Sequence, residues 1–223
     1  MFSKILTSAL IAGAAAGLIA AVLQYFFVQP VLLHAELFET GELVHQGVSD
    51  AHFEMPAFEV QRNLLTAAFS MLIYAGYGLV MVALMSAAES QGAAINARTG
   101  IVWGLAGFIA VHLAPGFGLA PEVPGSSAAD VADRQIWWYG TVAATMIGLW
   151  LIAFGKNAVL WAVAAALILA PHVIGAPHPD TMTGPAPTEI GGLFAARSFG
   201  VGIAAWAMLG CLAGYFWSNA EDA

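Results

Sequence analysis

Six mostly apolar stretches, each near membrane-spanning length, alternate with shorter polar segments along the chain. They cover residues 5–28, 64–88, 100–119, 136–154, 158–174 and 193–217. A helix that crosses a bilayer needs about 20 such residues. Only Gly155, Lys156 and Asn157 separate the fourth and fifth stretches, and this turn-forming cluster predicts a helical hairpin. The pattern predicts an all-α fold, a polytopic helical membrane bundle of about six spans forming one domain over residues 1–223.

Composition supports a membrane protein and excludes several other classes. Hydrophobic residues make up 60% of the 223 and charged residues 9%, whereas soluble domains carry about 25% charged residues. The net charge of −8 with six basic residues argues against nucleic-acid binding, which needs clusters of Lys and Arg. Cys211 is the one cysteine, so neither an intramolecular disulfide nor a paired-cysteine metal site is available.

The first apolar stretch follows Lys4 and is longer than the about 7–15 apolar residues of a signal peptide. We therefore expect a retained first span, with cleavage near residues 14–16 as the alternative. Lys and Arg are shared equally between the two sides of the six-span pattern. Lys4 before the first span and an acidic segment after it nevertheless favour cytoplasmic termini, with residues 29–63 outside.

Polar chemistry gathers on that predicted outer side, which carries all six histidines and eleven of the fourteen carboxylates. Imidazole and carboxylate are ligands of borderline divalent metals such as cobalt, nickel and zinc. The distribution predicts an outward-facing site where metal ions enter the membrane. Its candidate ligands are His34, Glu36, His112, Glu122, His172 and His178.

His172 and His178 form the sharpest local feature, because prolines stand on both sides of each histidine. Residues six apart do not share a helix face, so a helix that ends here and folds back would let both rings converge with Glu122. Two histidines that merely cap a helix end are the alternative reading.

His112 is followed by Pro115 and Gly116, which predict a broken helix at membrane depth. Backbone carbonyls freed by such breaks form ion sites in many transporters; a helix that simply ends there is the alternative. In the first outer segment, Glu36 and Glu39 would share one helix face if the helix continues past Pro30. His45 and His52 lie in an acidic stretch that a solvated loop explains equally well.

Arg197 falls inside the last apolar stretch, where a central charge costs about 2.5–3.5 kcal/mol. We expect a structural charge pair with Glu122, Asp133 or Glu189, and we expect Arg134 to pair with its neighbour Asp133. Three GxxxG patterns occur, but in a chain with 24 glycines chance explains them, so we regard them as uninformative for helix packing. No HExxH, GxSxG, GxGxxG or Walker A pattern is present, and we predict no enzyme activity.

Several runs together resemble the CbtA family of probable cobalt transporter subunits over nearly the whole chain. They are Leu113-Ala114-Pro115, Gly118 to Gly125, Arg134-Gln135-Ile136-Trp137-Trp138, and Pro171 to Pro177. The resemblance implies a bacterial inner-membrane protein, Co²⁺ as the transported ion, and a small single-span partner, CbtB, with a histidine-rich end. The family is usually described with five spans. The resemblance also favours His172, His178 and Glu122 as metal ligands. The type of ligand does not distinguish Co²⁺ from Ni²⁺, because both bind imidazole and carboxylate.

Two other functions stay open at the level of sequence. A membrane haem protein could use His112 and His172 as axial ligands, because both lie at membrane depth on different predicted helices. A membrane scaffold with no transported ligand would need none of the histidines.

Overall fold

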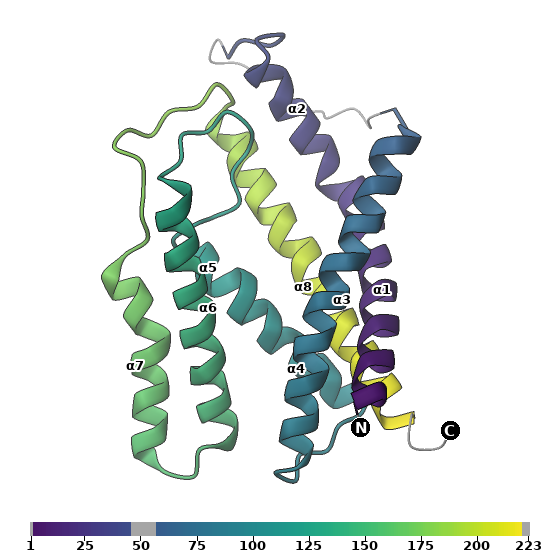
Figure 1. The fold of residues 1–223 in the computed structure, drawn as a ribbon. Coiled ribbons are helices and arrows are strands. Elements are labelled where there is room, and N and C mark those ends of the chain that lie inside the picture. The colour runs from purple at the N-terminus through teal and green to yellow at the C-terminus, as the bar shows by residue number, and fades with distance from the viewer. Residues whose placement is uncertain (1, 46–56, 220–223) are drawn as a thin grey trace. The chain divides into compact units, whose positions relative to one another are not determined.

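The computed structural model describes residues 2–45 and 57–219, and within these ranges the chain is helical with no strand (Figure 1). The helices are α1 (Phe2–Phe27), α2 (Gln29–Glu39), α3 (Val60–Glu89), α4 (Ala97–Phe108), the π-helix η1 (Ile109–Leu113), α5 (Ala114–Gly116), α6 (Val131–Phe154), α7 (Ala158–Ile174) and α8 (Thr188–Asn219). The all-α, polytopic prediction is confirmed. Residues 46–56, which include His52, lie outside the described residues.

Whether the chain has five or six spans depends on α7. Five helical segments of the described chain are long and apolar enough to cross a membrane: α1, α3, the continuous run Ala97–Gly116, α6 and α8. The sixth, α7, is apolar but has 17 residues, the lower end of the range of about 17–25 that spans a bilayer. Each predicted apolar stretch therefore became a helix, and five of the six meet the usual length.

The chain divides into two compact units. Unit 1 comprises Met1–Pro30, Met55–Phe108 and Gly200–Ala223, and unit 2 comprises Val31–Glu54 and Ile109–Phe199. Unit 1 thus contains α1, α3, α4 and the second half of α8, whereas unit 2 contains most of α2, η1, α5, α6, α7 and the first half of α8.

Small residues set the close packing of α1 against α3 in unit 1. The buried positions of α1 recur in pairs every four residues and are Ser8, Ala9, Ala12, Gly13, Ala16, Gly17, Ala20 and Ala21. A Cβ on Gly17 would lie 2.5 Å from the Cα of Met71 on α3, and one on Gly78 would lie 2.8 Å from the carbonyl oxygen of Ala9. The two backbones approach so closely because no side chain stands between them.

A second glycine contact joins α4 to α8 in the same unit. Gly100 packs on Gly210 and Gly214, and Gly104 packs on the backbone of Trp206 and Ala207. All three GxxxG patterns of the sequence therefore lie at helix–helix contacts. Our interpretation of them as uninformative was wrong, because their meaning depends on which helix faces them.

The far ends of three helices meet in unit 1. The indole N–H of Trp217 on α8 donates to the Oε2 of Glu89 on α3 at 3.0 Å. The ammonium of Lys4 on α1 lies 4.2 Å from the centre of the Trp217 ring. A cation over an indole face is attracted by the ring, so Trp217 ties α1, α3 and α8 together.

The predicted helical hairpin is present in unit 2, where α6 and α7 run side by side (Figure 1). Asn157 begins α7 as an N-cap, its Oδ1 accepting from the amide of Leu160 at 3.0 Å. Gly148 allows the side chain of Ile168 to approach α6. The helix considered possible beyond Pro30 is present as α2, which begins directly after α1 with Pro30 in its first turn.

Candidate histidine and carboxylate site

The end of α7 is held by a tryptophan from α6. The carbonyl of Pro171 accepts the indole N–H of Trp137 at 3.1 Å and the amide of Gly175 at 3.0 Å. Gly175 has φ 89°, a conformation that side chains rarely adopt, so the chain leaves the helix sharply at this point. The predicted end of the helix after the fifth stretch is confirmed.

His172 sits between two aromatic rings at this helix end. Its ring meets Phe117 at 5.9 Å and Trp137 at 6.1 Å between centroids, both edge-to-face. These contacts limit how the imidazole can turn. Sequence reasoning did not identify either aromatic residue as a neighbour of His172, because both are distant from it along the chain.

The third apolar stretch does not break at His112. The helix continues through the wider π-turn of η1, which contains His112, passes Pro115 and ends at Gly116. Pro115 has no amide to donate and a proline ring clashes with a regular helical turn before it, which explains a locally wider turn. We expected a helix break with free backbone carbonyls next to His112, and the structure has a π-turn there instead. Such turns are frequent at functional sites.

The two non-helical segments after the third and fifth stretches lie side by side in unit 2. Ser127 accepts from the amide of Thr183 at 2.8 Å through its Oγ, and the same hydroxyl donates to the carbonyl of Thr181 at 2.9 Å. The side chains of Ala176 and Trp137 pack directly against Gly118, where an added Cβ would clash with both. Both segments are non-helical, over residues 117–130 and 175–187.

Glu122 is engaged by a different arginine from the one we expected. Its Oε2 accepts from the Nη2 of Arg134 at 3.2 Å, with about a third of each side chain exposed. The expected pair between Arg134 and Asp133 was wrong, because Asp133 points from the first turn of α6 and Arg134 reaches the preceding segment instead. Near the start of α3, Arg62 lies 3.7 Å from Glu59, as its neighbouring charges suggested.

The α2 helix places His34, Glu36 and Glu39 on one element. The face of α2 that carries Val31, Ala35 and Phe38 is buried and packs with Val123 and Ile190. His34 is half-buried and meets the Phe38 ring edge-to-face at 5.5 Å between centroids. His45 is exposed beyond the end of α2, while His52 lies outside the described residues.

All six predicted ligands belong to unit 2, yet they do not form a metal centre. Across residues 2–45 and 57–219, no group of three or more His, Cys, Asp or Glu side chains is arranged to hold a metal ion. The predicted convergence of Glu122, His172 and His178 is therefore not present in this structure. Neighbouring segments bring these ligands into one region without bringing their donor atoms together.

The remaining charge predictions concern α8. Glu189 lies in its first turn, where a carboxylate interacts favourably with the helix dipole, and it accepts a 3.3 Å hydrogen bond from Thr188. Arg197 is half-buried two turns further on. A pair between Arg197 and Glu189 stays a prediction.

A comparison with protein-family models decides the family. The model of CbtA, described as a probable cobalt transporter subunit, matches residues 2–218 of the 223. The chain belongs to the CbtA family. No curated protein and no solved structure matches the chain.

CbtA membership agrees with the helices described above. The chain is a multi-pass membrane protein of a cobalt transporter subunit family, and cobalt is the ion that the family description names. A subunit works with other chains, so residues of this CbtA protein do not have to supply a complete metal site.

Proposed function

We propose that this CbtA chain is the membrane subunit of a Co²⁺ uptake transporter, and that ions enter through the histidine- and carboxylate-bearing end of unit 2. The host membrane is the inner membrane of a bacterium, and the chain carries no enzyme activity. The observation that supports the proposal is the contact of the His172 ring with Phe117, at the start of the segment that bears Glu122.

His172 has the properties of an orienting ligand. A metal-bound histidine works best when neighbouring groups hold its ring in place. Phe117 and Trp137 both make edge-to-face contacts with this ring, and Trp137 also donates a hydrogen bond to the backbone carbonyl of Pro171 next to it. An ion that reaches His172 would therefore meet an imidazole whose freedom to rotate is already reduced by its neighbours.

Glu122 adds a carboxylate that is charged and accessible. Arg134 occupies its Oε2, and 37% of the Glu122 side chain is exposed. A divalent cation carries twice the charge of a guanidinium, so it can compete for this carboxylate at short range. Arg134 then acts as a counter-ion that holds Glu122 in place between ions.

A second subunit completes the coordination in this proposal. The described residues hold no ready group of three ligands, whereas stable Co²⁺ binding by protein side chains needs several. The partner implied by the family resemblance, a small single-span chain with a histidine-rich end, would add imidazoles at the same side of the membrane. His178, His34 and Glu36 are the further ligands that this chain could contribute.

Cobalt uptake by cells that express the chain with its partner tests the proposal. His172→Ala should reduce uptake more than His45→Ala or His52→Ala, because an ion losing its water shell at His172 cannot replace that ligand with bulk water. The difference should widen at saturating cobalt, where capture no longer limits the rate. Membrane levels of each variant serve as the control.

Equal uptake by the three variants at saturating cobalt, at equal membrane levels, would show that His172 is not a pathway ligand. Competition by Ni²⁺ in the same assay then ranks the two ions, which share their preferred ligands. Normal metal uptake by cells that lack the chain would contradict the transport function as a whole.

A further inference from the structure

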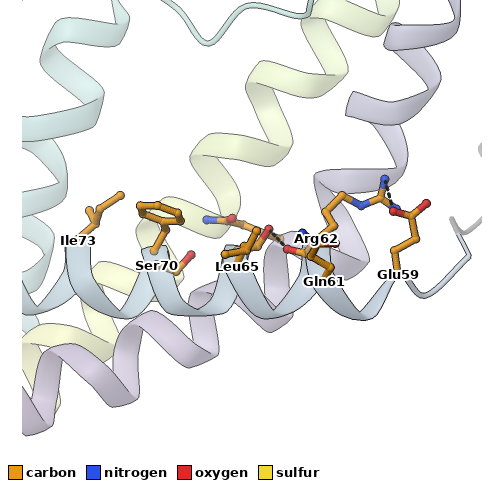
Figure 2. Close-up of a pocket in the computed structure, with 9 residues that line it drawn as sticks. Glu59, Gln61, Arg62, Leu65, Ser70 and Ile73 are labelled. Atoms are coloured by element: carbon orange, nitrogen blue, oxygen red, sulfur yellow. Dashed lines mark hydrogen bonds and ion pairs between the residues drawn. The ribbon is translucent and has the colours of Figure 1, made fainter.

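A groove runs along one face of α3 in unit 1, and none of the candidate metal ligands lines it. It has a volume of about 660 Å³ and is lined by Gln24 of α1 and, on or beside α3, by Glu59, Gln61, Arg62, Leu65, Thr66, Phe69, Ser70 and Ile73. Figure 2 shows the labelled side chains in a row along α3, from Glu59 and Arg62 at one end to Ile73 at the other. None of these residues has a role in the proposed metal path.

The groove changes from charged to apolar along its length. The start of α3 contributes the ion pair of Glu59 and Arg62, 3.7 Å apart. Leu65, Phe69 and Ile73 follow at successive turns, and half or more of each side chain is exposed. A charged end and an apolar end, in this order along a spanning helix, match the two ends of an amphiphile.

The length of the groove matches one leaflet of a bilayer. Ile73 is eleven residues beyond Arg62, which corresponds to about 16 Å along an α-helix. Half of the hydrocarbon core of a bilayer is about 15 Å. Because α3 has 30 residues and Ile73 is near its middle, the groove ends where the opposite leaflet begins.

The charged end presents both signs at once. Glu59 is 64% exposed and Arg62 34% exposed, so both can be reached from the groove mouth. A guanidinium binds phosphate oxygens with paired hydrogen bonds, and a carboxylate binds the N–H groups of a primary ammonium.

We propose that this groove is a binding site for a zwitterionic phospholipid with a primary ammonium, of the phosphatidylethanolamine class. The phosphate binds Arg62, the ammonium binds Glu59, and one acyl chain lies along Leu65, Phe69 and Ile73. A purely anionic lipid fits less well, because Glu59 repels it.

The occupant of the groove is a lipid and not a second transmembrane helix. Helices in this protein pack through small residues, as α1 does against α3 and Gly100 does against Gly210. The groove instead presents large, exposed side chains over the depth of one leaflet, whereas a partner helix would cross both.

Native mass spectrometry of the purified full chain tests the site. The delipidated protein is mixed with equal amounts of phosphatidylethanolamine, phosphatidylcholine and phosphatidylglycerol that carry identical acyl chains. Phosphatidylethanolamine should be the most retained lipid. Arg62→Gln should weaken retention of all three by about tenfold, the loss expected for one charged hydrogen-bonding partner.

Glu59→Gln gives the sharper result. It should lower phosphatidylethanolamine to the level of phosphatidylcholine, whose quaternary ammonium donates no hydrogen bond, and leave the latter unchanged. The control is Arg98→Gln, an exposed arginine in the first turn of α4 outside the groove, which should change nothing. Where Arg62→Gln fails to fold, Arg62→Lys should retain the phosphate preference only in part.

Three outcomes would overturn the site. The first is strongest retention of phosphatidylglycerol, which would mean a site for anionic lipids. The second is equal retention of the three lipids by wild type and both groove variants. The third is a chain dimer that Arg62→Gln dissociates, which would assign the groove to a helix. None of these outcomes depends on cobalt, so the metal proposal stands or falls separately.

Discussion

Replacing Gly100 with alanine should destabilise the protein, although alanine favours a helix. The glycine packs against α8, where the new Cβ would overlap the carbonyl oxygen of Gly210 and lie 2.9 Å from its carbonyl carbon. An ordinary Cβ contact is 3.4 Å or longer, so the carbonyl carbon alone requires a separation of 3.4 − 2.9 = 0.5 Å, and the closer carbonyl oxygen requires more. Backbone atoms cannot rotate away as a side chain would.

The magnitude follows from two opposing effects. A gap of about 0.5–1 Å forfeits a quarter to a half of the dispersion attraction across a contact, and overpacking of a filled interior costs about 1–3 kcal/mol. Alanine returns about 0.5–1 kcal/mol of helix preference relative to glycine. We expect a net loss of about 1–2 kcal/mol, or a fall in the unfolding midpoint of about 2–8 °C for a chain of this size.

Gly76→Ala is the matched control, because Gly76 is an exposed glycine in α3 with no described atom within 4 Å of the new Cβ. The same chemical change should there leave the midpoint unchanged or raise it by a few degrees. Thermal unfolding of both variants in the same detergent, followed by helical circular dichroism, measures the difference. Equal midpoints for the two variants would refute close packing of α4 on α8.

Three further predictions concern other parts of the chain. Trp137→Phe removes the 3.1 Å hydrogen bond to Pro171 but keeps an aromatic ring. It should lower cobalt uptake in cells with little change in the amount of protein in the membrane. Unchanged uptake would show that this hydrogen bond at the end of α7 has no role in transport. Glu89→Gln replaces a charged acceptor of Trp217 with a neutral one. It should lower the free energy of unfolding in detergent by about 1 kcal/mol, and no change would show that this contact is not stabilising. A reporter fused after Ala223 should be active only in the cytoplasm, and activity outside would favour five spans.

Hydropathy was sufficient to locate the spans because length and apolar content are what a bilayer demands of any spanning helix. The six apolar stretches all became helices, and the turn at Gly155 to Asn157 separates two of them as expected. Most helices begin earlier than the apolar stretches, by up to five residues as at the start of α6, whereas the helix of the third stretch ends three residues earlier than predicted, at Gly116. Polar residues such as Arg134 extend a helix beyond its apolar part, so hydropathy alone underestimates its length.

Contacts between helices could not be predicted in the same way. Gly100 and Gly210 are 110 positions apart, and no local pattern indicates that their backbones meet. The partner of Glu122 depended on the path of the segment before α6, which brought Arg134 within 3.2 Å. The π-turn at His112 needed knowledge of how Pro115 is accommodated. Each of these features is a property of the folded chain and not of a short window of sequence.

The absence of a complete ligand set within the described residues is consistent with transport in physical terms. A pathway must bind an ion strongly enough to take it up and weakly enough to release it. In the proposed path, an ion gains Glu122 only by competing with Arg134, so the carboxylate binds less tightly than a free one would, and the guanidinium returns when the ion leaves. The aromatic neighbours of His172 contact its ring in this ion-free structure, so in the proposed path they restrict the imidazole before an ion arrives. Two ligands prepared in this way, completed by a second subunit, form a site that passes an ion onward, whereas a closed site of four ligands within one chain would retain it.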